Sequence, residues 1–346
     1  MPKSSVILSF KPKAVTKELL GTLSERAQDI MKKRYGLGAE TERQTLEAIG
    51  KEYGITRERV RQIENFSLST IRRSDEFVKA EPFFEELRDS MDDYGKVVKE
   101  SSYLDHLSED QGFQNHVHFL LVLGDYFEKL REDDDFFHRW TVDEDLAEKV
   151  HKGLKNLYKE LSDDDLVSGT DIVSKFMTHL RKEMKDLRDE EIAKRWLTLA
   201  KFIGQNPLGE WGVSHSPNVK ARGVRDLAYL VIRDHGSPMH FTEVASSITE
   251  RFGKKAHQAT VHNELIKDKR FVLVGRGLYA LREWGYERGV VRDVIKDILN
   301  EEGPLKKEDI VDKVLKERHV KENTILVNLQ NSKYFKKDKS GRYKPV

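Results

Sequence analysis

The segment from Thr45 to Ser74 constrains the fold of this chain most, because its pattern predicts two helices joined by one tight turn. Leu46 and Ile49 give the first helix an apolar face at helical spacing. Gly54 supplies the turn, since glycine adopts positive φ at no steric cost. Thr56 is typical of a residue that caps the N-terminus of the next helix. The segment therefore predicts a helix-turn-helix, whose second helix enters the major groove of DNA.

The second predicted helix has an inner and an outer face. Val60, Ile63 and Leu68 fall at helical spacing and are predicted to point inward. The outer face near the start of the helix then consists of Arg57, Glu58, Arg61 and Gln62. These residue types suit base recognition, because Arg donates two hydrogen bonds to guanine, Gln pairs with adenine and Glu accepts from cytosine.

The alternative for this outer face is an ordinary solvated surface, stabilised by ion pairs such as that between Glu58 and Arg61. Against it stands the alternation of Arg57, Arg59 and Arg61, which have only one acid between them. The well-formed turn before the helix also favours DNA. We therefore interpret the face as a candidate DNA-reading surface.

The sequence TRERVRQIE, residues 56–64, closely resembles region 4 of the sigma-70 family of transcription factors, the module that binds the −35 promoter element. LSERAQDIMKKRYGL, residues 23–37, resembles the helix and turn that open this region. The resemblance covers residues 22–74. It implies contacts of double-stranded DNA bases with Arg57, Glu58, Arg61 and Gln62, and contacts of phosphate with Gln44 and Thr45. It further implies that Arg59, Arg72 and Arg73 face the DNA backbone or a neighbouring protein.

The same resemblance leaves RNA polymerase core open as a second partner. Sigma factors melt promoter DNA with region 2, which lies upstream of region 4. Only about 20 residues precede Thr22, so we expect no region 2 and no unaided promoter opening.

Charge is partitioned along the chain. Residues 1–74 contain 15 Lys and Arg against 9 Asp and Glu, residues 75–210 contain 19 against 33, and residues 211–346 contain 27 against 18. Because attraction to phosphate depends on local charge density, both ends are expected to reach DNA and the middle to be repelled from it.

The composition excludes several functional classes. The chain has no cysteine, which rules out disulfides and thiolate metal sites. No apolar run approaches the roughly 18 residues of a membrane span, and the apolar stretch near Met1 is too short for a signal peptide. We therefore expect a cytoplasmic protein with no membrane contact, no cofactor and no metal.

The middle of the chain shows helical periodicity. Apolar residues recur at spacings of three and four in two runs: Phe113, Val117, Leu120, Leu121, Phe127 and Leu130, then Ile172, Phe176, Met177, Leu180 and Met184. His116 and His118 would point to different faces of a helix, so they are not expected to share a metal. The pattern predicts an acidic, all-α domain over residues 75–210, followed by a linker over 211–221.

The last third contains an internal repeat. GVRDLAYLVIRDHGSPMHFTEVASSI begins at Gly223, and GVVRDVIKDILNEEGPLKKEDIVDKVL begins at Gly289. Each copy predicts three helices and then a hairpin of aromatic and basic residues, which is the winged-helix plan. The first copy is predicted as a domain over residues 222–286. Over residues 222–284 it resembles, through PMHFTEVASSI and GRGLYAL, the HARE-HTH winged helix, a family that includes the N-terminal domain of the bacterial RNA polymerase delta subunit. The second, residues 287–346, is predicted to be winged-helix-like.

The first winged helix offers further candidate DNA contacts. The polar residues of its third helix and the basic residue at its wing tip are Lys254, Lys255, Gln258, His262 and Arg276. Protein docking by this helix is equally open. Phe271, Leu273, Leu278 and Tyr279 are predicted to lie in the core. The fold class is therefore mainly α: an N-terminal extension over 1–21, a helix-turn-helix, an acidic helical domain and two winged helices with small β-hairpin wings.

The sequence predicts a DNA-binding transcription regulator that is not an enzyme. A DNA-recognition component of a restriction or nuclease system is one alternative, supported by Asp171, Glu183 and Lys185, which match a D-x(n)-E-x-K metal motif. Helical periodicity around these residues argues against it, because Glu183 and Lys185 would diverge by roughly 200° on a helix. A regulator that binds only RNA polymerase is the other alternative.

The absence of catalysis is open to a direct test. Incubating the protein with supercoiled and linear DNA plus magnesium or manganese should leave both DNAs intact. Cleavage by the wild type that disappears in Glu183→Ala would instead establish the nuclease alternative.

Overall fold

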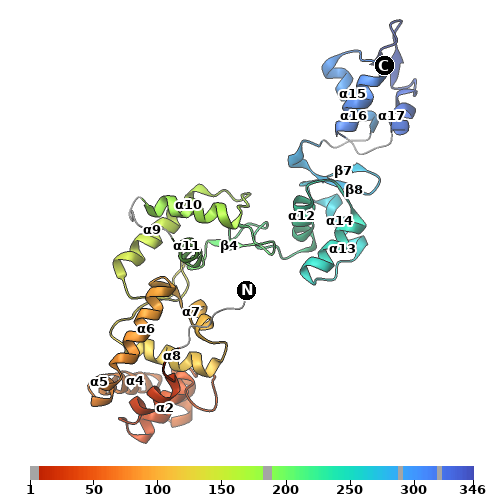
Figure 1. Cartoon of the computed structure of the whole chain (residues 1–346). Helices are drawn as coiled ribbons and strands as arrows, with labels where there is room; N and C mark the ends of the chain where they lie inside the picture. The colour runs from red at the N-terminus through yellow and green to blue at the C-terminus, as the bar shows by residue number, and fades with distance from the viewer. Residues whose placement is uncertain (1–7, 182–188, 287–290, 318–321) are drawn as a thin grey trace. The chain divides into compact units, whose positions relative to one another are not determined.

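The computed structural model describes residues 8–181, 189–286, 291–317 and 322–346. Within these ranges the chain is mainly helical, with short antiparallel strands (Figure 1). The chain divides into two compact units, residues 1–204 and 205–346. None of the described helices is long and apolar enough to cross a membrane.

The predicted helix-turn-helix is present. Helix α3 spans Leu46–Tyr53 and helix α4 spans Arg57–Arg72. The Thr45 hydroxyl accepts a hydrogen bond from the backbone N–H of Ala48, and the Thr56 hydroxyl accepts one from the N–H of Arg59, both at 3.1 Å. Gly54 ends α3 with φ of 64°. The Thr56 cap and the turn therefore lie where the sequence predicts them, and Thr45 is a second cap, which was not predicted.

The helix-turn-helix shares its core with the segments before and after it. These are α1 (Pro12–Leu20), α2 (Glu25–Tyr35), α5 (Asp75–Lys79), α6 (Glu81–Tyr94), α7 (Glu100–Leu107) and α8 (Gln111–Leu123). One apolar cluster includes Leu19, Ile71, Phe84 and Trp140. The boundaries expected after residues 21 and 74 are therefore wrong as limits between cores, because α1 and α8 help to bury the inner sides of α2 and α4.

The middle of the chain is not all-α. Strands β1 (Val97–Lys99), β2 (Glu128–Leu130) and β3 (Arg139–Thr141) form an antiparallel sheet in the order β1-β3-β2. Gly124 follows α8 in extended conformation, so Leu130 lies in a strand rather than on the helix that its spacing suggested. Short apolar runs fit either structure, which is why periodicity alone failed here.

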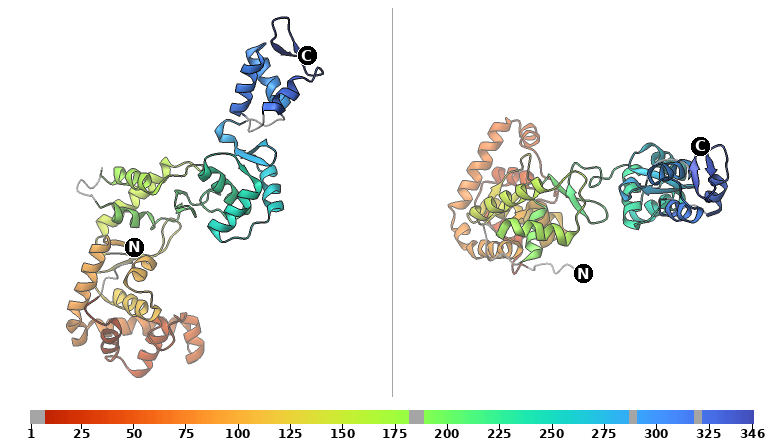
Figure 2. Two further views of the ribbon diagram at one scale, coloured as in Figure 1. Left: turned by 45° about the vertical axis from the view of Figure 1, so that its right-hand side comes forward. Right: turned by 90° about the horizontal axis from the view of Figure 1, so that it is seen from above.

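Three further helices complete the first unit. They are α9 (Glu144–Glu160), α10 (Gly169–Arg181) and α11 (Glu190–Leu197), and strand β4 (Ile203–Gln205) follows them. Helix α10 packs against both α9 and α11 (yellow-green in Figure 2). Ile172, Phe176 and Leu180 of α10 are fully buried, as their spacing predicted. Met184 lies outside the described residues.

Residues 211–221 do not form a free linker. Trp211–Val213 is strand β5, and Val213 and Val219 are buried. The Asn218 side chain accepts a hydrogen bond at 3.0 Å from Arg270, which also pairs with Asp226 at 3.1 Å. The segment thus belongs to the packed structure of the first winged helix, and the expectation of a linker was wrong.

The first repeat has the winged-helix plan. Its helices are α12 (Val224–His235), α13 (Phe241–Phe252) and α14 (Gln258–Lys267), and its strands are β6 (Met239–His240), β7 (Phe271–Gly275) and β8 (Leu278–Leu281). A short 3-10 helix, η1 (Arg282–Trp284), follows. Phe271 and Tyr279 are buried as predicted, but the side chain of Leu273, two residues before the end of β7, is 50% exposed.

The second repeat follows the same order. It contains α15 (Val291–Glu302), α16 (Lys307–Glu317), α17 (Glu322–Leu329), β9 (Phe335–Lys337) and β10 (Tyr343–Pro345). Leu305 bridges to Tyr343 as Met239 pairs with Tyr279 in the first copy. The Arg-Asp ion pair at the start of each copy is also repeated, as Arg225–Asp226 and Arg292–Asp293.

Histidine burial makes the stability of the first unit depend on pH. Burial, reinforced by the charge of Arg139, lowers the pKa of His151 to about 4, and burial also lowers the pKa values of His116 and His118. The ordinary pKa of histidine is about 6.5. Between these values the unfolded chain binds more protons, so the free energy of unfolding falls as pH decreases.

We expect His151 alone to remove about 1–2 kcal/mol of stability between pH 7 and pH 5. Urea unfolding at the two pH values would measure this. His151→Gln should shrink the difference, because Gln still offers an acceptor to Arg139, whose Nε lies 2.9 Å from His151, but cannot be protonated. His257→Gln, at an exposed position, should leave the difference unchanged. A pH dependence that persists undiminished in His151→Gln would contradict the assignment.

Candidate nucleic-acid interface

Helix α4 is fixed to α2 and α3 by a small apolar cluster. Ile30, Ile49 and Val60 are completely buried there, with Ile63 packed beside them. The buried stripe of α4 consists of Val60, Glu64, Ser67 and Ile71. Ile63 and Leu68, which the sequence placed inward with Val60, flank this stripe and are half-buried. The opposite side of α4 is left for solvent or ligand.

A buried carboxylate sets the rotation of α4. Glu64 accepts a hydrogen bond from the Tyr35 hydroxyl at 2.9 Å and one from Arg34 Nε at 3.2 Å. Burial, together with the adjacent Glu64 carboxylate, raises the pKa of Tyr35, so its hydroxyl remains a donor. Sequence reasoning missed this role for Glu64. Its position four residues after Val60, which places both residues on the same side of α4, could have indicated that Glu64 is buried.

The predicted outer face is exposed at the N-terminal end of α4. Arg57, Glu58, Arg61 and Gln62 are all accessible to solvent. Arg61 donates two hydrogen bonds to Glu58, of 2.8 and 2.7 Å, and this contact lowers the pKa of Glu58. The ordinary ion pair weighed against DNA recognition is therefore present in the free protein. Such exposed pairs are screened by solvent and contribute little to stability, so they do not prevent a stronger contact from forming.

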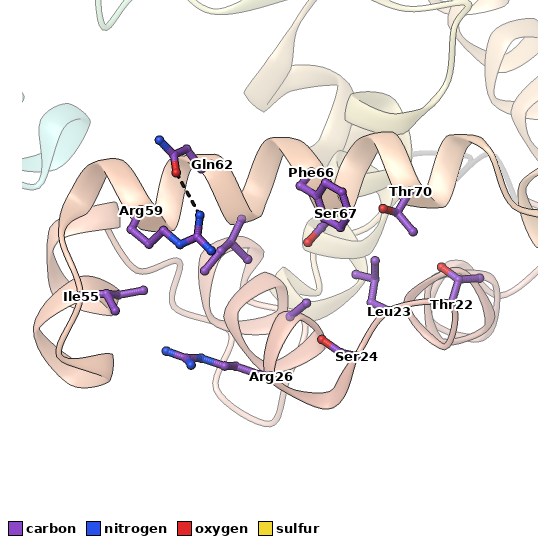
Figure 3. Close-up of a pocket in the computed structure, with 12 residues that line it drawn as sticks. Thr22, Leu23, Ser24, Arg26, Ile55, Arg59, Gln62, Phe66, Ser67 and Thr70 are labelled. Atoms are coloured by element: carbon purple, nitrogen blue, oxygen red, sulfur yellow. Dashed lines mark hydrogen bonds between the residues drawn. The ribbon is translucent and has the colours of Figure 1, made fainter.

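Helix geometry divides the polar residues of α4 into two sets. At about 100° per residue, Arg57, Arg61, Asn65 and Glu58 fall within one sector of roughly 100°, whereas Arg59 is turned about 200° from Arg57. Arg59 donates a hydrogen bond of 3.1 Å to Gln62 (Figure 3). Asn65 is exposed on the same sector as Arg61 and was not singled out from the sequence.

The start of α3 presents two predicted phosphate contacts. The Thr45 oxygen accepts the capping hydrogen bond, which leaves its O–H free to donate. The backbone of Gln44 is bonded to α2 through both groups: its N–H donates to Lys33 at 3.0 Å and its carbonyl accepts from Arg34 at 3.2 Å. The Gln44 side chain is therefore presented from a fixed backbone.

The loop before α3 is held by one buried amide. Asn115 of α8 donates hydrogen bonds to the carbonyl groups of Gly36 at 3.0 Å and Thr41 at 2.7 Å. Its own oxygen accepts from Arg43 Nε at 2.8 Å. Asn115 is fully buried, so water does not substitute for these partners. The position of Gln44 and Thr45 therefore depends on a helix outside the helix-turn-helix.

The two arginines at the end of α4 differ. Arg72 donates to the carbonyl groups of Val122 at 2.8 Å and Leu123 at 3.0 Å, and lies 3.8 Å from Asp125. It thereby joins α4 to the C-terminal end of α8, and we leave it out of the proposed DNA contacts. Arg73 is exposed and caps α4.

A groove of about 810 Å³ runs beside α4. Figure 3 shows it between the Thr22–Ser24 turn and the Arg59, Gln62 and Phe66 side of α4. The Phe66 side chain is 73% exposed, and Leu23, Ala27 and Ile63 give the groove an apolar lining. A large exposed aromatic ring in a groove is typical of a protein-docking surface.

The candidate residues of the first winged helix are dispersed. Lys255 and Gln258 are exposed near the start of α14, and Arg276 is exposed at the wing turn. Lys254 donates to the backbone carbonyl of Arg222 at 2.6 Å. His262 is half-buried, with its ring 4.6 Å from that of Phe241.

The structure adds no support for the metal-binding motif of the nuclease alternative. Asp171 accepts a hydrogen bond of 2.7 Å from Ser168 at the start of α10, and Glu183 and Lys185 lie outside the described residues. Among the described residues, no group of three or more His, Asp or Glu side chains is arranged to hold a metal ion.

The Asn115 contacts predict a measurable cost. Asn115→Ala should lower the free energy of unfolding by about 1–3 kcal/mol, because the carbonyl groups of Gly36 and Thr41 lose their donor. Urea unfolding would test this. The control is Gln111→Ala, which removes only a 3.2 Å bond to Asn115 from an exposed side chain. Equal, small effects of both substitutions would show that water replaces the amide.

Comparison with known proteins agrees with this geometry. A family model described as "Sigma-70, region 4" matches residues 19–73. The model of the HARE-HTH family, whose description includes the words "restriction endonuclease HTH domain", matches residues 223–284. The chain is 40% identical over 72 residues to the RNA polymerase principal sigma factor HrdD of Streptomyces viridifaciens, which is 21% of each protein.

Two other relatives match over a similar segment. The identity is 40% over 68 residues to the RNA polymerase sigma factor SigA of a Bacillus species, covering 20% of this chain and 18% of that protein. It is 43% over 60 residues to the RNA polymerase sigma factor RpoD of Helicobacter pylori strain 26695, covering 17% and 9%. The chain thus spans about a fifth or less of the relatives it matches.

These matches bear out the fusion that the sequence motifs indicated. Both matched domains are DNA-binding modules. The three relatives that match over the first of them are RNA polymerase sigma factors. The chain therefore carries a sigma-70 region 4 helix-turn-helix at residues 19–73 and a HARE-HTH domain at residues 223–284.

Proposed function

We propose that this protein is a transcription regulator that binds −35-like promoter DNA with α3 and α4 and contacts RNA polymerase. The proposal is carried by the N-terminal part of α4, where Arg57, Glu58, Arg61 and Gln62 are exposed. On the buried side of the same helix, Glu64 holds α4 in place through its hydrogen bond with Tyr35. A rigid helix that presents bidentate donors is what base reading in the major groove requires.

The energetics of Arg61 support binding. Solvent screens the exposed Glu58–Arg61 ion pair, so it contributes little to stability. A bidentate contact between Arg and guanine gives about 1–3 kcal/mol of discrimination against other bases. We propose that guanine takes the place of Glu58 on Arg61 and that the released Glu58 carboxylate accepts from a cytosine amino group.

The phosphate contacts follow from α3. Thr45, with its free O–H, and the Gln44 side chain are proposed to hold the DNA backbone beside α4. Arg73 is proposed to approach phosphate at the far end of α4. In the first winged helix, we propose that Lys255, Gln258 and Arg276 give an additional DNA contact, since all three are exposed.

Base reading by α4 gives the sharpest test. Arg61→Ala and Gln62→Ala should each cost about 1–3 kcal/mol on the preferred site and relax specificity at one or two base pairs. Binding-site selection on wild type and both variants would measure this. Lys51→Ala, on the exposed side of α3, is the matched control and should leave the selected sequence unchanged. An identical preferred sequence for all four proteins would refute the proposal.

The groove beside α4 is proposed as the contact for RNA polymerase. Phe66 points into it from the side of α4 that is turned away from Arg57 and Arg61 (Figure 3). DNA contacted by Arg57 and Arg61 would then leave Phe66 open to polymerase, whereas Gln62, which also lines the groove, lies between the two surfaces. The names of the relatives, which are RNA polymerase sigma factors, suggest this partner.

Phe66→Ser should weaken binding to RNA polymerase core by about 1–2 kcal/mol, as expected for an aromatic anchor at an interface. Biolayer interferometry with immobilised core enzyme would measure it, and DNA affinity should stay the same. Val78→Ser, at a 71% exposed apolar residue outside the groove, is the control. If Phe66→Ser left polymerase binding intact, the partner would have to be sought on another surface.

A further inference from the structure

The C-terminal hairpin concentrates positive charge. Between Tyr334 and Val346 the exposed basic residues are Lys336, Lys337, Lys339, Arg342 and Lys344, and the only acid is Asp338. The corresponding hairpin of the first winged helix, residues 271–281, has Arg276 as its only charged residue. The two copies of the repeat therefore differ clearly in the charge of their wings.

Two of these lysines lie directly opposite each other. In the antiparallel register of β9 and β10, Lys336 pairs with Lys344. Phe335, the residue before Lys336, is buried in the core of this domain, so Lys336 and Lys344 share the outer face of the hairpin. Their Cβ atoms are then about 5 Å apart, and like charges in that arrangement destabilise a strand pair. A polyanion that bound both ammonium groups would relieve this repulsion.

The single acid of the hairpin is engaged in the turn. Asp338 accepts hydrogen bonds from the backbone N–H groups of Ser340 at 2.8 Å and Arg342 at 2.9 Å, which lower its pKa. Its other oxygen lies 3.4 Å from Arg342 Nε. In the described parts of the chain this is the only ion pair of the hairpin, so Lys336 and Lys344 have no carboxylate partner there.

The third helix of this domain brings no basic side chain. Helix α17, ENTILVNL, has Glu322 as its only charged residue, and the side chain of Val327 is 60% exposed. A helix without Lys or Arg gives no charge-assisted contact with phosphate. Of the third helix and the hairpin, only the hairpin therefore offers basic side chains to an anion, and α17 has no side chain suited to read guanine.

We propose that the β9–β10 hairpin binds the phosphate backbone of duplex DNA through Lys336 and Lys344, independently of base sequence. This second contact is separate from α4 and does not rest on promoter recognition. The main competing explanation is that lysines on a short exposed hairpin prevent pairing with other strands. That explanation predicts aggregation of the variants, whereas DNA binding predicts a loss of affinity that depends on salt.

The test uses the full chain and two fluorescent duplexes, one with the site selected for wild type and one with that site scrambled. In Lys336→Gln/Lys344→Gln, the slope of log K against log salt should become shallower by about 1.8, and affinity at low salt should fall on the order of tenfold. The loss should be equal on both duplexes. Failure of base reading by α4 would instead abolish the preference between the two duplexes, so the two proposals fail in different ways.

The controls hold charge and folding constant. Lys306→Gln/Lys307→Gln removes the same charge from exposed residues outside the hairpin and should change the slope far less. Lys336→Arg/Lys344→Arg should keep the wild-type slope. Circular dichroism should show that all variants melt as wild type does or at a higher temperature. Equal slopes for the two Gln variants, or no loss of affinity in Lys336→Gln/Lys344→Gln, would overturn the proposal. So would competition by polyglutamate as effective as competition by DNA at equal charge.

Discussion

Helix α8 is the constraint on which the N-terminal unit depends. From Gln114 to Leu121 every residue is buried, so the helix is surrounded on all sides by the elements that it organises. Near its first turn, Asn115 holds the loop that leads to α3, and at its last turn the carbonyl groups of Val122 and Leu123 hold Arg72 of α4. Both ends of the helix-turn-helix are thus fixed to one helix that lies further along the chain, beyond α5, α6 and α7.

The helix-turn-helix was predictable because its determinants are local. Thr45 and Thr56 cap helices, Gly54 makes the turn, and the outer residues of α4 follow from helical periodicity. The winged-helix plan was predictable for a similar reason, because the same order of helices and hairpin could be read from both copies of the repeat. By contrast, Asn115, Arg72 and Asn218 form hydrogen bonds with residues distant in sequence, and no local pattern predicts such contacts.

Two errors have a shared physical cause. The all-α prediction for residues 75–210 relied on apolar periodicity, and the linker prediction for 211–221 relied on the composition of a short segment. Strands of three residues, such as β2 and β5, carry too little pattern to differ from a helix or a loop. Their conformation is decided by tertiary packing, as the burial of Trp211 and Val213 illustrates.

The shared core around α8 shows that the segment of sequence similarity and the folding unit have different limits. The segment that resembles sigma factors covers residues 19–73, but the apolar cluster that keeps its helices in place reaches from Leu8 to Trp140. The unit of sequence similarity is therefore smaller than the unit of folding. Substitutions at α1 or α8 alter the support of α4 although they lie outside the similar segment, so the position of α4 depends on a stretch of chain more than twice as long.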